Sequence, residues 1–531
     1  MKWQSRFAYG EELYLQKGIR LFASVLSAAI SGMEVCPVQV EADVSSGLPC
    51  FTMVGFPSTQ VKEAQDRVRT ALKNNGISLP PKKVTVNLAP ADLRKEGAGF
   101  DLPVAAAVLA ASGFIEPQLL RNVMVVGELS LNGEVRSVSG VLPRVIRARE
   151  LGCRYCIIPY ENLAEGALVK DMKVVGVQNI KEVLKLVSDP DAFGKENQFS
   201  EVNSEENQIE ESLVDFGEIC GQESARRAAE IAVSGFHNIL FIGPPGTGKT
   251  MLAKRIPTIM PSLTFEESLE LTKIYSIAGL LSPKRPLIKA RPFRSPHHTS
   301  SSAALAGGGR IPGPGEVTLA HRGVLFLDEM PEFARGSLEV LRQPLEDKQI
   351  QLSRASGTYV FPAGFILVAA MNPCPCGYYP DMNKCRCTPG EVSHYLHKLS
   401  QPLLERIDLC ADVPPVNFSQ ISGEKSGESS ALIRKRVEKA RRIQQKRYQN
   451  EKICFNGELS GKQIRKYCVL TENAFQVAKN AFELMELSAR SYHRILKVSR
   501  TIADMEGEEL IHTRHVAEAL TYKAFDKKYR S

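Results

Sequence analysis

The sequence predicts a multidomain α/β protein, and three features lead to this fold class. Short apolar runs at 239–242, 323–327 and 365–370 each end in polar residues, which is typical of buried parallel strands carrying a ligand site. Strand-like and helix-like patterns alternate in the N-terminal part, and the chain after Pro414 is predominantly helical. A length of 531 residues fits about three or four domains.

The N-terminal part alternates two periodicities. Residues 38–44 alternate apolar and polar side chains as in a half-buried strand, and residues 61–72 have the apolar spacing of an amphipathic helix. Asn132-Gly133 favours a two-residue hairpin turn. In chain order we expect strands at 38–44 and 84–88, helices at 61–72 and 102–111, a hairpin of 123–131 with 134–138, and further elements at 142–151, 155–159 and 172–187. They predict one α+β domain over residues 22–188, after an extension of residues 1–21.

Residues 189–214 differ in composition from both neighbours. Glutamates there stand among Asn, Ser and Gln, and few apolar residues are present. Such a segment is typical of an acidic flexible linker, because it cannot bury enough apolar surface to fold. A functional acidic tail is the alternative.

A phosphate-binding loop follows the apolar run 239–242 and fits the pattern G-x-x-x-x-G-K-[ST]. Glycines let backbone N–H groups face a phosphate chain, and the next helix presents its positive end to the anion. We expect Lys249 to reach the β- and γ-phosphates and the Thr250 hydroxyl to ligate Mg²⁺. The loop consists of Gly243, Pro244, Pro245, Gly246, Thr247, Gly248, Lys249 and Thr250. A chance glycine-rich match is the alternative, which the strand before and the apolar helix after disfavour.

Two further apolar runs end in groups suited to phosphate chemistry. Residues 323–327 precede Asp328, which can hold Mg²⁺, and Glu329, which can orient and polarise an attacking water. Residues 365–370 precede Asn372, a neutral group suited to contact the γ-phosphate or the water. Asn372 as a simple loop cap is the alternative.

The predicted nucleotide domain covers residues 215–420, and a helical domain covers 421–531. Arg406 precedes the helical part and is either a surface ion-pair residue or an arginine finger for the γ-phosphate of a neighbouring subunit. The expected helices lie at 432–448, 461–467, 472–485 and 492–505, with a last one from Thr513.

Four of the twelve cysteines form the pattern C-x-C-x8-C-x-C: Cys374, Cys376, Cys385 and Cys387. Four thiolates this close fit a tetrahedral Zn²⁺ site, although the spacing is tighter than the usual C-x2-C pairs. Four reduced cysteines in a surface loop are the alternative. His297 and His298 have no further ligand nearby in sequence, so loop hydrogen bonding is the expected role.

Bulk properties exclude several protein classes. No apolar run approaches the ~18–20 residues that span a bilayer, and the first twenty residues are too charged for a secretory signal, so we expect a cytoplasmic protein. A formal charge of +8 spread over so long a chain favours a polyanionic partner only weakly.

The order of phosphate loop, Asp-Glu, Asn, arginine and helical domain resembles the AAA+ ATPase plan. Finer motifs are similar to the magnesium-chelatase-like AAA+ group, and the chain from about Phe22 resembles its YifB/ComM family. The motifs are Arg-Pro-Phe-Arg-Ser-Pro-His-His-Thr at 291–299, Ala-Gly-Gly-Gly at 306–309, Pro-Gly-Pro-Gly-Glu at 312–316, Leu-Arg-Gln-Pro-Leu-Glu at 341–346 and Met-Asn-Pro at 371–373. The resemblance implies a hexameric ring that uses ATP and Mg²⁺ to translocate DNA, as a branch-migration helicase in recombination or natural transformation.

The resemblance also implies roles for single residues. Gly221 and Gln222 match the segment beside the adenine, Asp328 and Glu329 match Walker B, and Asn372 matches the first sensor. Arg406 matches the arginine finger. Arg490 best matches the second sensor, with Arg494, one helical turn later, as the alternative.

Two insertions distinguish this AAA+ group, at about 292–315 and 349–362. The second alternates like a β-hairpin with its tip at 355–357. In related ring helicases such hairpins point into the pore, so Arg354 near the tip is a candidate DNA-phosphate contact. A hairpin that only packs against a neighbouring subunit is the alternative.

The N-terminal domain resembles the Lon-protease C-terminal fold (ribosomal S5 domain 2-like) without its chemistry. Gly99 falls where the resemblance places the serine nucleophile, and Leu142 falls where it places the lysine base. Peptide hydrolysis then has no covalent route, so we expect a scaffold or a DNA- or partner-binding module. Two rival functions stay open: a magnesium-chelatase subunit, for which the chain lacks a D-x-S-x-S metal-adhesion motif and no porphyrin is expected, and a protein remodeller or protease.

Overall fold

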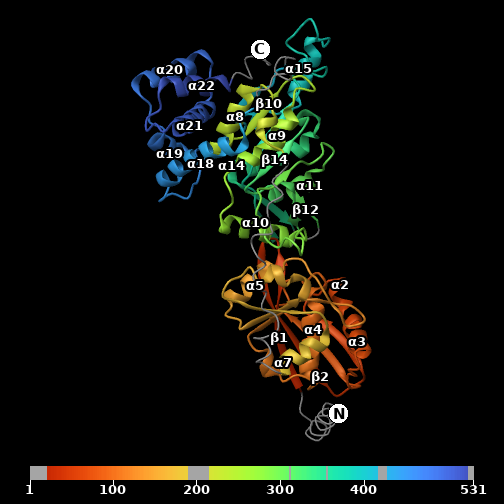
Figure 1. Cartoon of the computed structure of the whole chain (residues 1–531). Coiled ribbons are helices and arrows are strands. Elements are labelled where there is room, and N and C mark those ends of the chain that lie inside the picture. Colours follow the sequence, from red (N-terminus) through yellow and green to blue (C-terminus); the bar gives the residue numbers. More distant parts are fainter. Residues whose placement is uncertain (1–20, 189–213, 310–311, 355–356, 417–426, 524–531) are drawn as a thin grey trace. The chain divides into compact units, whose positions relative to one another are not determined.

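The computed structural model describes residues 21–188, 214–309, 312–354, 357–416 and 427–523. The chain divides into two compact units, residues 1–206 with 272–288 and residues 207–271 with 289–531 (Figure 1). The predicted extension before residue 21 and the predicted linker up to residue 213 lie outside the described residues. None of the helices in the described ranges combines the length and apolarity that crossing a bilayer requires.

The first unit is built on a seven-stranded mixed sheet in the order β3-β4-β2-β1-β5-β8-β9. Its centre is a long antiparallel pair, β1 and β2, whose register runs from Leu21 opposite Val44 to Ser31 opposite Glu34. The predicted strand 38–44 is confirmed within β2 and shows the expected alternation of buried and exposed residues. The strands are β1 (Leu21–Ser31), β2 (Glu34–Ser45), β3 (Cys50–Val54), β4 (Lys83–Ala89), β5 (Val123–Val125), β8 (Tyr155–Pro159) and β9 (Lys173–Val177).

The helices of this unit lie where the apolar periodicity places them, with two differences. The predicted helix 61–72 is divided at Glu63 into two helices. The predicted strand 123–131 is also divided, because β5 joins the main sheet while β6 pairs with β7 around Asn132-Gly133. Helix α4 is buried at every position, as its Ala- and Val-rich sequence requires. The remaining elements are α2 (Thr59–Lys62), α3 (Ala64–Asn74), α4 (Asp101–Ala111), β6 (Glu128–Leu129), β7 (Val135–Arg136), α5 (Val141–Glu150), α6 (Leu163–Gly166) and α7 (Ile180–Ser188).

The second unit contains a five-stranded parallel sheet in the order β11-β14-β17-β10-β18. The three predicted apolar strands are confirmed as β14, β17 and β10. In the register Ile242 lies opposite Met371 and Leu327 opposite Ala369, so their carboxyl ends meet at one edge. The strands are β10 (Ile239–Ile242), β11 (Phe293–Arg294), β14 (Val324–Leu327), β17 (Ile366–Met371) and β18 (Leu409–Asp412).

Helices α8 (Glu223–Gly235), α9 (Lys249–Ile259) and α10 (Phe265–Ile277) precede the first insertion, and the last residues of α10 belong to the first unit. The predicted hairpin over 349–362 is confirmed as β15 (Gln349–Arg354) and β16 (Gly357–Pro362), with residues 355–356 of its tip outside the described residues. The first insertion and its surroundings form α11 (Ser302–Ala306), β12 (Gly307–Gly308), β13 (Gly313–Pro314), α12 (Glu316–Leu319), α13 (Arg335–Glu339) and α14 (Arg342–Asp347).

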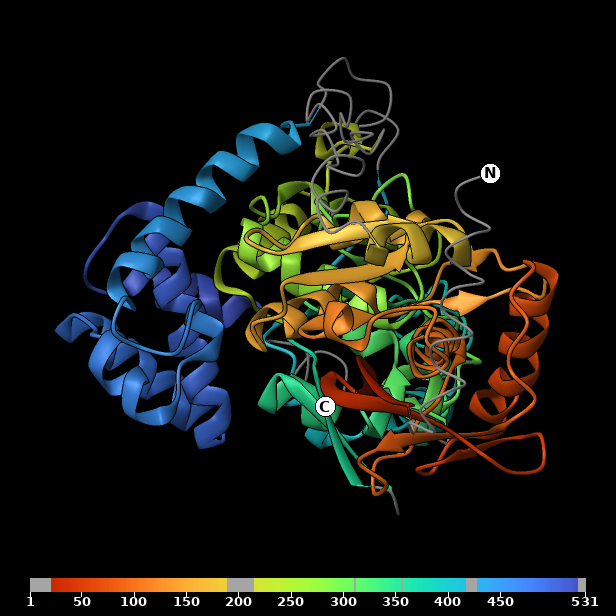
Figure 2. The ribbon, with the colours of Figure 1, turned by 90° about the horizontal axis from the view of Figure 1, so that it is seen from below.

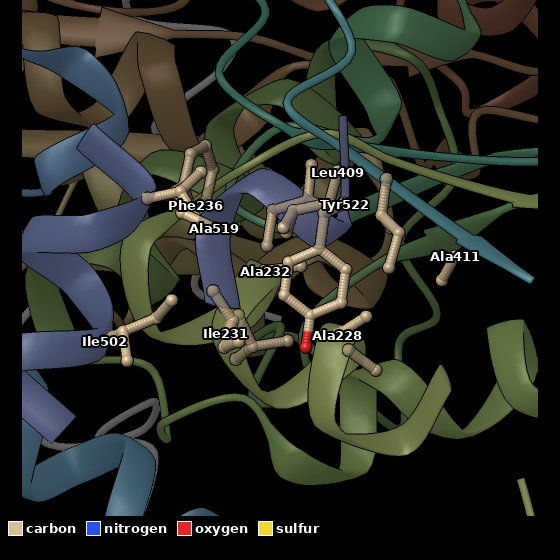
Figure 3. Packing of buried hydrophobic residues seen from close by; sticks show 14 of the residues in the cluster. Ala228, Ile231, Ala232, Phe236, Leu409, Ala411, Ile502, Ala519 and Tyr522 are labelled. Carbon is tan, nitrogen blue, oxygen red and sulfur yellow. The ribbon is translucent and has the colours of Figure 1, made fainter. Parts of the chain in front are cut away.

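Five C-terminal helices lie together, coloured blue in Figure 2. Ile502 of α21, Tyr522 directly after α22 and Leu409 of β18 belong to one apolar cluster with Ile231 of α8 (Figure 3). The helices are α18 (Ser430–Arg447), α19 (Gly461–Tyr467), α20 (Glu472–Leu484), α21 (Ala489–Glu506) and α22 (Thr513–Thr521), as the sequence predicts to within a few residues.

An ion cluster inside these helices centres on Asp504, which is fully buried. Its carboxylate accepts hydrogen bonds from the Arg447 guanidinium at 2.7 and 2.5 Å, from Arg500 at 3.1 Å and from the Asn456 amide at 2.8 Å. Burial of the carboxylate is tolerated because every oxygen is paired with a charged or polar donor.

Candidate nucleotide-binding site

The phosphate loop turns sharply after β10 because its glycines adopt conformations that other residues avoid. Gly246 and Gly248 have φ values of 76° and 89°. A Cβ on Gly243 would lie 2.1 Å from the Val413 carbonyl oxygen, so that position also needs glycine. A Cβ at Gly246 or Gly248 would meet no atom within 4 Å, which leaves the hollow of the loop open for a phosphate chain.

Lys249 at the start of α9 points into this loop. Its ammonium donates to the carbonyl oxygens of Gly243 at 2.7 Å and Pro244 at 2.8 Å, and to the Asn372 side-chain oxygen at 3.1 Å. Burial lowers the pKa of Lys249, and the negative charges of Asp328 and Glu329 act against that effect. The lysine is therefore held beside the predicted sensor asparagine, with donors that a phosphate oxygen can accept.

Thr250 and Asp328 form the predicted Mg²⁺ pair. The Thr250 hydroxyl donates to the Asp328 carboxylate at 2.7 Å. The other oxygen of Asp328 accepts the backbone N–H of Glu329 at 3.0 Å. Glu329 has φ 49°, a left-handed conformation rare for a non-glycine residue and frequent at functional sites. Hydroxyl and carboxylate oxygens are ligands that Mg²⁺ prefers, so these residues fit that ion.

Gln222 connects the segment before α8 to the phosphate loop. It lies in a left-handed conformation, φ 58°, at the N-terminus of α8. Its side-chain amide donates to the Thr247 carbonyl oxygen at 3.3 Å and to the Pro414 carbonyl oxygen at 2.6 Å. The predicted adenine-side residue thus contacts the loop, and its role toward adenine stays a prediction.

A cavity of about 810 Å³ lies beside Glu329 and Asn372. Its other wall comes from α15 (Pro389–His397), a helix that Thr388 and Glu391 begin with a reciprocal capping box. The lining residues are Glu329, Glu332, Asn372, Pro375, Thr388, Gly390, Glu391, His394, Tyr395 and Lys398. The sequence gives no local signal for this wall, because α15 reaches the site only through the fold.

Two contacts hold α15 and the residue after it, Lys398, beside Asn372 and Glu332. The backbone of Asn372 hydrogen-bonds the Tyr395 hydroxyl, although burial raises the pKa of that hydroxyl well above its usual range. Lys398 donates to both carboxylate oxygens of Glu332, at 3.0 and 3.2 Å. The rim of the cavity carries three carboxylates, those of Glu329, Glu332 and Glu391.

The predicted arginine finger, Arg406, and the predicted second sensor, Arg490, share one carboxylate. Arg406, after α16 (Gln401–Leu404), forms an ion pair with Glu346 and donates to the Pro402 carbonyl oxygen at 2.6 Å. Arg490, in α21, pairs with Glu346 at 3.0 Å and with Glu405 at 3.4 Å. Both arginines therefore lie on one patch around Glu346, the last residue of the motif at 341–346.

Arg494, the alternative second sensor, has a structural contact instead. It is buried, lies 3.4 Å from an Asp408 oxygen and donates to the Ile407 carbonyl oxygen at 3.2 Å. Burial lowers the pKa of Arg494, and the charge of Asp408 acts against that effect. Arg494 thus connects α21 to the start of β18.

The four predicted zinc cysteines come together between β17 and α15. All four sulfurs lie within 4.8 Å of one another, and no other metal-ligating group of three or more side chains occurs in the described part of the chain. The ring centroids of His297 and His298 lie 4.1 Å apart with the rings tilted, and His297 contacts the Thr299 hydroxyl at 2.9 Å, as expected for loop hydrogen bonding.

Arg354, the candidate DNA contact, is an exposed residue at the end of β15. Its guanidinium donates to the Ser353 carbonyl oxygen at 3.2 Å. A contact with DNA phosphate stays a prediction.

The first unit offers no nucleophile at the position predicted for one. Gly99 is buried, and a Cβ there would lie 3.9 Å from an Arg144 nitrogen. Arg144 donates to the backbone oxygens of Ala28, Ser139 and Gly140, and burial lowers its pKa to about 10. Because the Arg144 guanidinium is hydrogen-bonded to backbone carbonyl oxygens, a structural role is favoured over a role in acid–base catalysis.

Comparison with known proteins agrees with these observations. Residues 215–421 match the family described as magnesium chelatase, subunit ChlI, and residues 40–162 and 427–523 match two further ChlI families, the second of them its C-terminal part. The chain is 44% identical to the competence protein ComM of Haemophilus influenzae over 94% of this chain and 97% of that protein. It is 43% identical to the protein named YifB of Escherichia coli over 95% of this chain and 97% of that protein.

A more distant similarity covers part of the chain. A DNA repair protein RadA of Listeria monocytogenes is 30% identical over 185 residues, 33% of this chain and 38% of its own length.

Proposed function

The chain belongs to the YifB/ComM family, which resembles magnesium-chelatase-like AAA+ proteins. We propose that it is a cytoplasmic ATP-driven motor that translocates DNA as a hexameric ring. The proposed reaction is branch migration in recombination or natural transformation. ATP and Mg²⁺ are the proposed cofactors of the AAA+ domain, residues 215–420, and a zinc ion is proposed on the four cysteines. The Lon-like domain, residues 22–188, is proposed as a scaffold or partner-binding module.

One observation carries the proposal: the phosphate loop, Asp328 and Asn372 meet at one sheet edge in hydrogen-bonding distance of each other. Lys249 contacts Asn372 at 3.1 Å and Thr250 contacts Asp328 at 2.7 Å. The triphosphate and its Mg²⁺, when bound, supply the scissile bond and its charge compensation. The side chains that must surround them are already in mutual contact.

Each residue then has a defined task. Lys249 exchanges its carbonyl partners for phosphate oxygens, and Thr250 with Asp328 holds the metal ion. Glu329, which lines the cavity, orients the attacking water and stabilises the positive charge that develops on it. Asn372 donates to the water or the γ-phosphate, which leaves the positive charge to be supplied from elsewhere.

The missing positive charge is proposed to come from Arg406 and Arg490 of a neighbouring subunit. Both arginines pair with Glu346, so they lie on one patch and can be presented together. The cavity beside Glu329 carries three carboxylates on its rim, a lining complementary to an entering arginine. A heterologous interface of this kind forms a ring when the rotation between neighbouring subunits closes, and a closed ring is what we propose here.

DNA as the polyanionic partner rests on the family and on the hairpin β15–β16. The similar proteins include a competence protein and, over a third of this chain, a DNA repair protein. The exposed Arg354 is proposed to contact DNA phosphate from the hairpin.

The test is the ATPase rate of the purified chain with forked, branched and duplex DNA, with Lys249→Ala as control. We expect stimulation by DNA that falls steeply with salt, because phosphate contacts release counterions. Stimulation absent for every DNA, or a flat salt response, would overturn the motor proposal.

A chelatase subunit is the second candidate, favoured by the ChlI family matches over all three regions. Stimulation of the ATPase by a porphyrin with its partner subunits, and not by DNA, would establish it. A protease is a weaker candidate because Gly99 and Leu142 supply neither nucleophile nor base, and a casein-degradation assay would test it.

A further inference from the structure

The cysteine segment, residues 372–388, connects β17 to α15 without any helix or strand of its own. Two of its large apolar side chains, Met382 and Tyr378, are 69% and 39% exposed. A segment this long and this poor in buried apolar groups needs another source of order. The buried groups at its two ends are the thiols of Cys374 and Cys385.

The sulfurs have the spacing of ligands on a single ion. Cys374 lies 3.4 Å from Cys376 and 3.7 Å from Cys385, and Cys376 lies 3.5 Å from Cys385. Zinc–sulfur bonds of about 2.3 Å in a tetrahedron place the sulfurs about 3.8 Å apart. A disulfide would bring two of them to about 2.05 Å. The arrangement therefore matches a mononuclear S4 site and not a disulfide.

Backbone donors complete the site around Cys374. The N–H groups of Gly377 and Tyr379 point to its sulfur at 3.2 and 3.4 Å. Donors of this kind stabilise a thiolate and orient it toward a metal ion. The Gly377 N–H also donates to the Cys374 carbonyl oxygen at 3.0 Å, which closes the turn between the first two cysteines.

The same turn rests on the phosphate loop. Gly377 has φ 87°, and a Cβ there would lie 2.5 Å from Pro245 Cδ. The chain is therefore in direct contact with a residue of the nucleotide loop, at a position where only glycine fits. Asn372 and Pro375, which line the cavity beside Glu329, flank the first cysteine.

The other end of the segment fixes the opposite wall of the cavity. Cys387 directly precedes Thr388, the N-cap of α15. Through α15 this end carries Glu391 and Tyr395, which line the same cavity as Asn372. One ion that holds the four sulfurs thus connects the two walls of the proposed active site and braces its phosphate loop.

We infer that Cys374, Cys376, Cys385 and Cys387 bind one Zn²⁺ and that this zinc knuckle, residues 374–387, positions Pro245 and Asn372 for ATP turnover. Zinc is the expected metal because four thiolates with no open position form a closed structural site. The residues of the knuckle are positioning residues, since the ATP itself is held by the loop and strands. The positioning role rests on the proposed ATPase activity, and the zinc site does not.

The first experiment measures metal content of the full chain purified under reducing conditions, by elemental analysis. We expect one zinc per chain in the wild type, loss of it in Cys385→Ser, and full retention in Cys454→Ser, an exposed cysteine outside the cluster. Cobalt substituted for zinc should show the absorption of a tetrahedral thiolate site. A colourless, metal-free wild type, or a coloured iron protein, overturns the zinc assignment.

The second experiment separates metal binding from positioning by means of Gly377→Ala. This variant keeps all four sulfurs but places a Cβ against Pro245. We expect zinc content to be unchanged and kcat/KM for ATP to fall about 10- to 100-fold, as for a misplaced catalytic constellation. Gly152→Ala, at a glycine with a similar left-handed φ of 70° whose added Cβ meets no atom within 4 Å, is the matched control and should keep wild-type kinetics.

The outcomes distinguish the two proposals. Zinc present with Gly377→Ala kinetics unchanged overturns the positioning role. Zinc present in a wild type that hydrolyses no ATP with any DNA leaves the metal site standing and overturns the proposed function instead. ATP hydrolysis by a wild type that holds no zinc overturns the metal site and leaves the proposed function standing.

Discussion

Replacing Arg406 by alanine tests whether the active site is completed by a second subunit. Arg406 is 11% exposed and is held by Glu346 and by the Pro402 carbonyl oxygen at 2.6 Å. Glu346 is half exposed, so giving up that ion pair costs about 1 kcal/mol or less after solvent screening. An arginine acting on the transferred phosphoryl group is worth about 10³- to 10⁵-fold, or about 4–7 kcal/mol. We expect the ATPase rate of Arg406→Ala to fall by that factor, because the gain far exceeds the cost of release.

The assay is DNA-stimulated phosphate release, first for each variant and then for mixtures. Arg406→Ala keeps its own phosphate loop, and Lys249→Ala keeps its own arginine, so mixing the two inactive chains should recover activity at about a quarter of the seams. Arg342→Ala, a neighbouring arginine paired with Glu339 at the surface, is the control and should stay near the wild-type rate. Unchanged turnover in Arg406→Ala, or no recovery on mixing, would refute action across a subunit seam.

Three further predictions follow from single contacts. Glu329→Gln should lower kcat about 10²- to 10⁴-fold while ATP binding, followed by fluorescence of a labelled nucleotide, is retained; equal losses of both would place Glu329 in binding. A hydrogen bond from His321 lowers the pKa of Glu270 to about 2 against the effect of burial. Its contribution to stability is therefore present above the ordinary pKa of about 4.5 and is lost as pH falls toward 2. Glu270 is over a third exposed, so Glu270→Gln should reduce the acid sensitivity of thermal unfolding by only about 1 kcal/mol, and identical pH profiles would contradict this. Asp504→Ala should destabilise the second unit by about 3–5 kcal/mol in denaturant titration, because it removes the carboxylate that neutralises the guanidinium groups of Arg447 and Arg500, and a loss below 1 kcal/mol would show that the cluster is not needed.

Much of the nucleotide unit was predictable because its strands are buried on both faces. A run such as Ile239–Ile242 is apolar at every position, as a strand buried on both faces requires, and the phosphate-loop pattern that begins at Gly243 marks its carboxyl end. Strand β18 was missed, because Leu-Cys-Ala-Asp is short and ordinary and becomes a strand through pairing with β10. Strand β1 was missed for a related reason. Its Leu-, Ala- and Ser-rich sequence suits a helix as well, and the full-length pairing with β2 decides its state.

The residues of the site also fall into those that local motifs predict and those that only the fold brings together. Lys249, Thr250 and Asp328 follow from local motifs, since the physics of a phosphate loop acts within a few residues. The α15 wall, the contact of Gly377 with Pro245 and the meeting of Arg406 with Arg490 depend on segments far apart in sequence. No local pattern encodes such contacts. The resemblance supplied the roles of Arg406 and Arg490, whereas the Gly377 contact and the α15 wall were not predicted.

The placement of charge in the second unit argues for a site that one subunit leaves incomplete. Lys249 stands at the phosphate end, but the cavity beside Glu329 is rimmed by carboxylates, and its one lysine, Lys398, is already paired with Glu332. The cations suited to a γ-phosphate, Arg406 and Arg490, are instead held by Glu346. A triphosphate bound to such a subunit would face negative charge on the side where charge develops during cleavage. On the proposed function, the carboxylates that would receive a neighbour's arginine also disfavour hydrolysis by a lone subunit, so we expect turnover to depend on assembly.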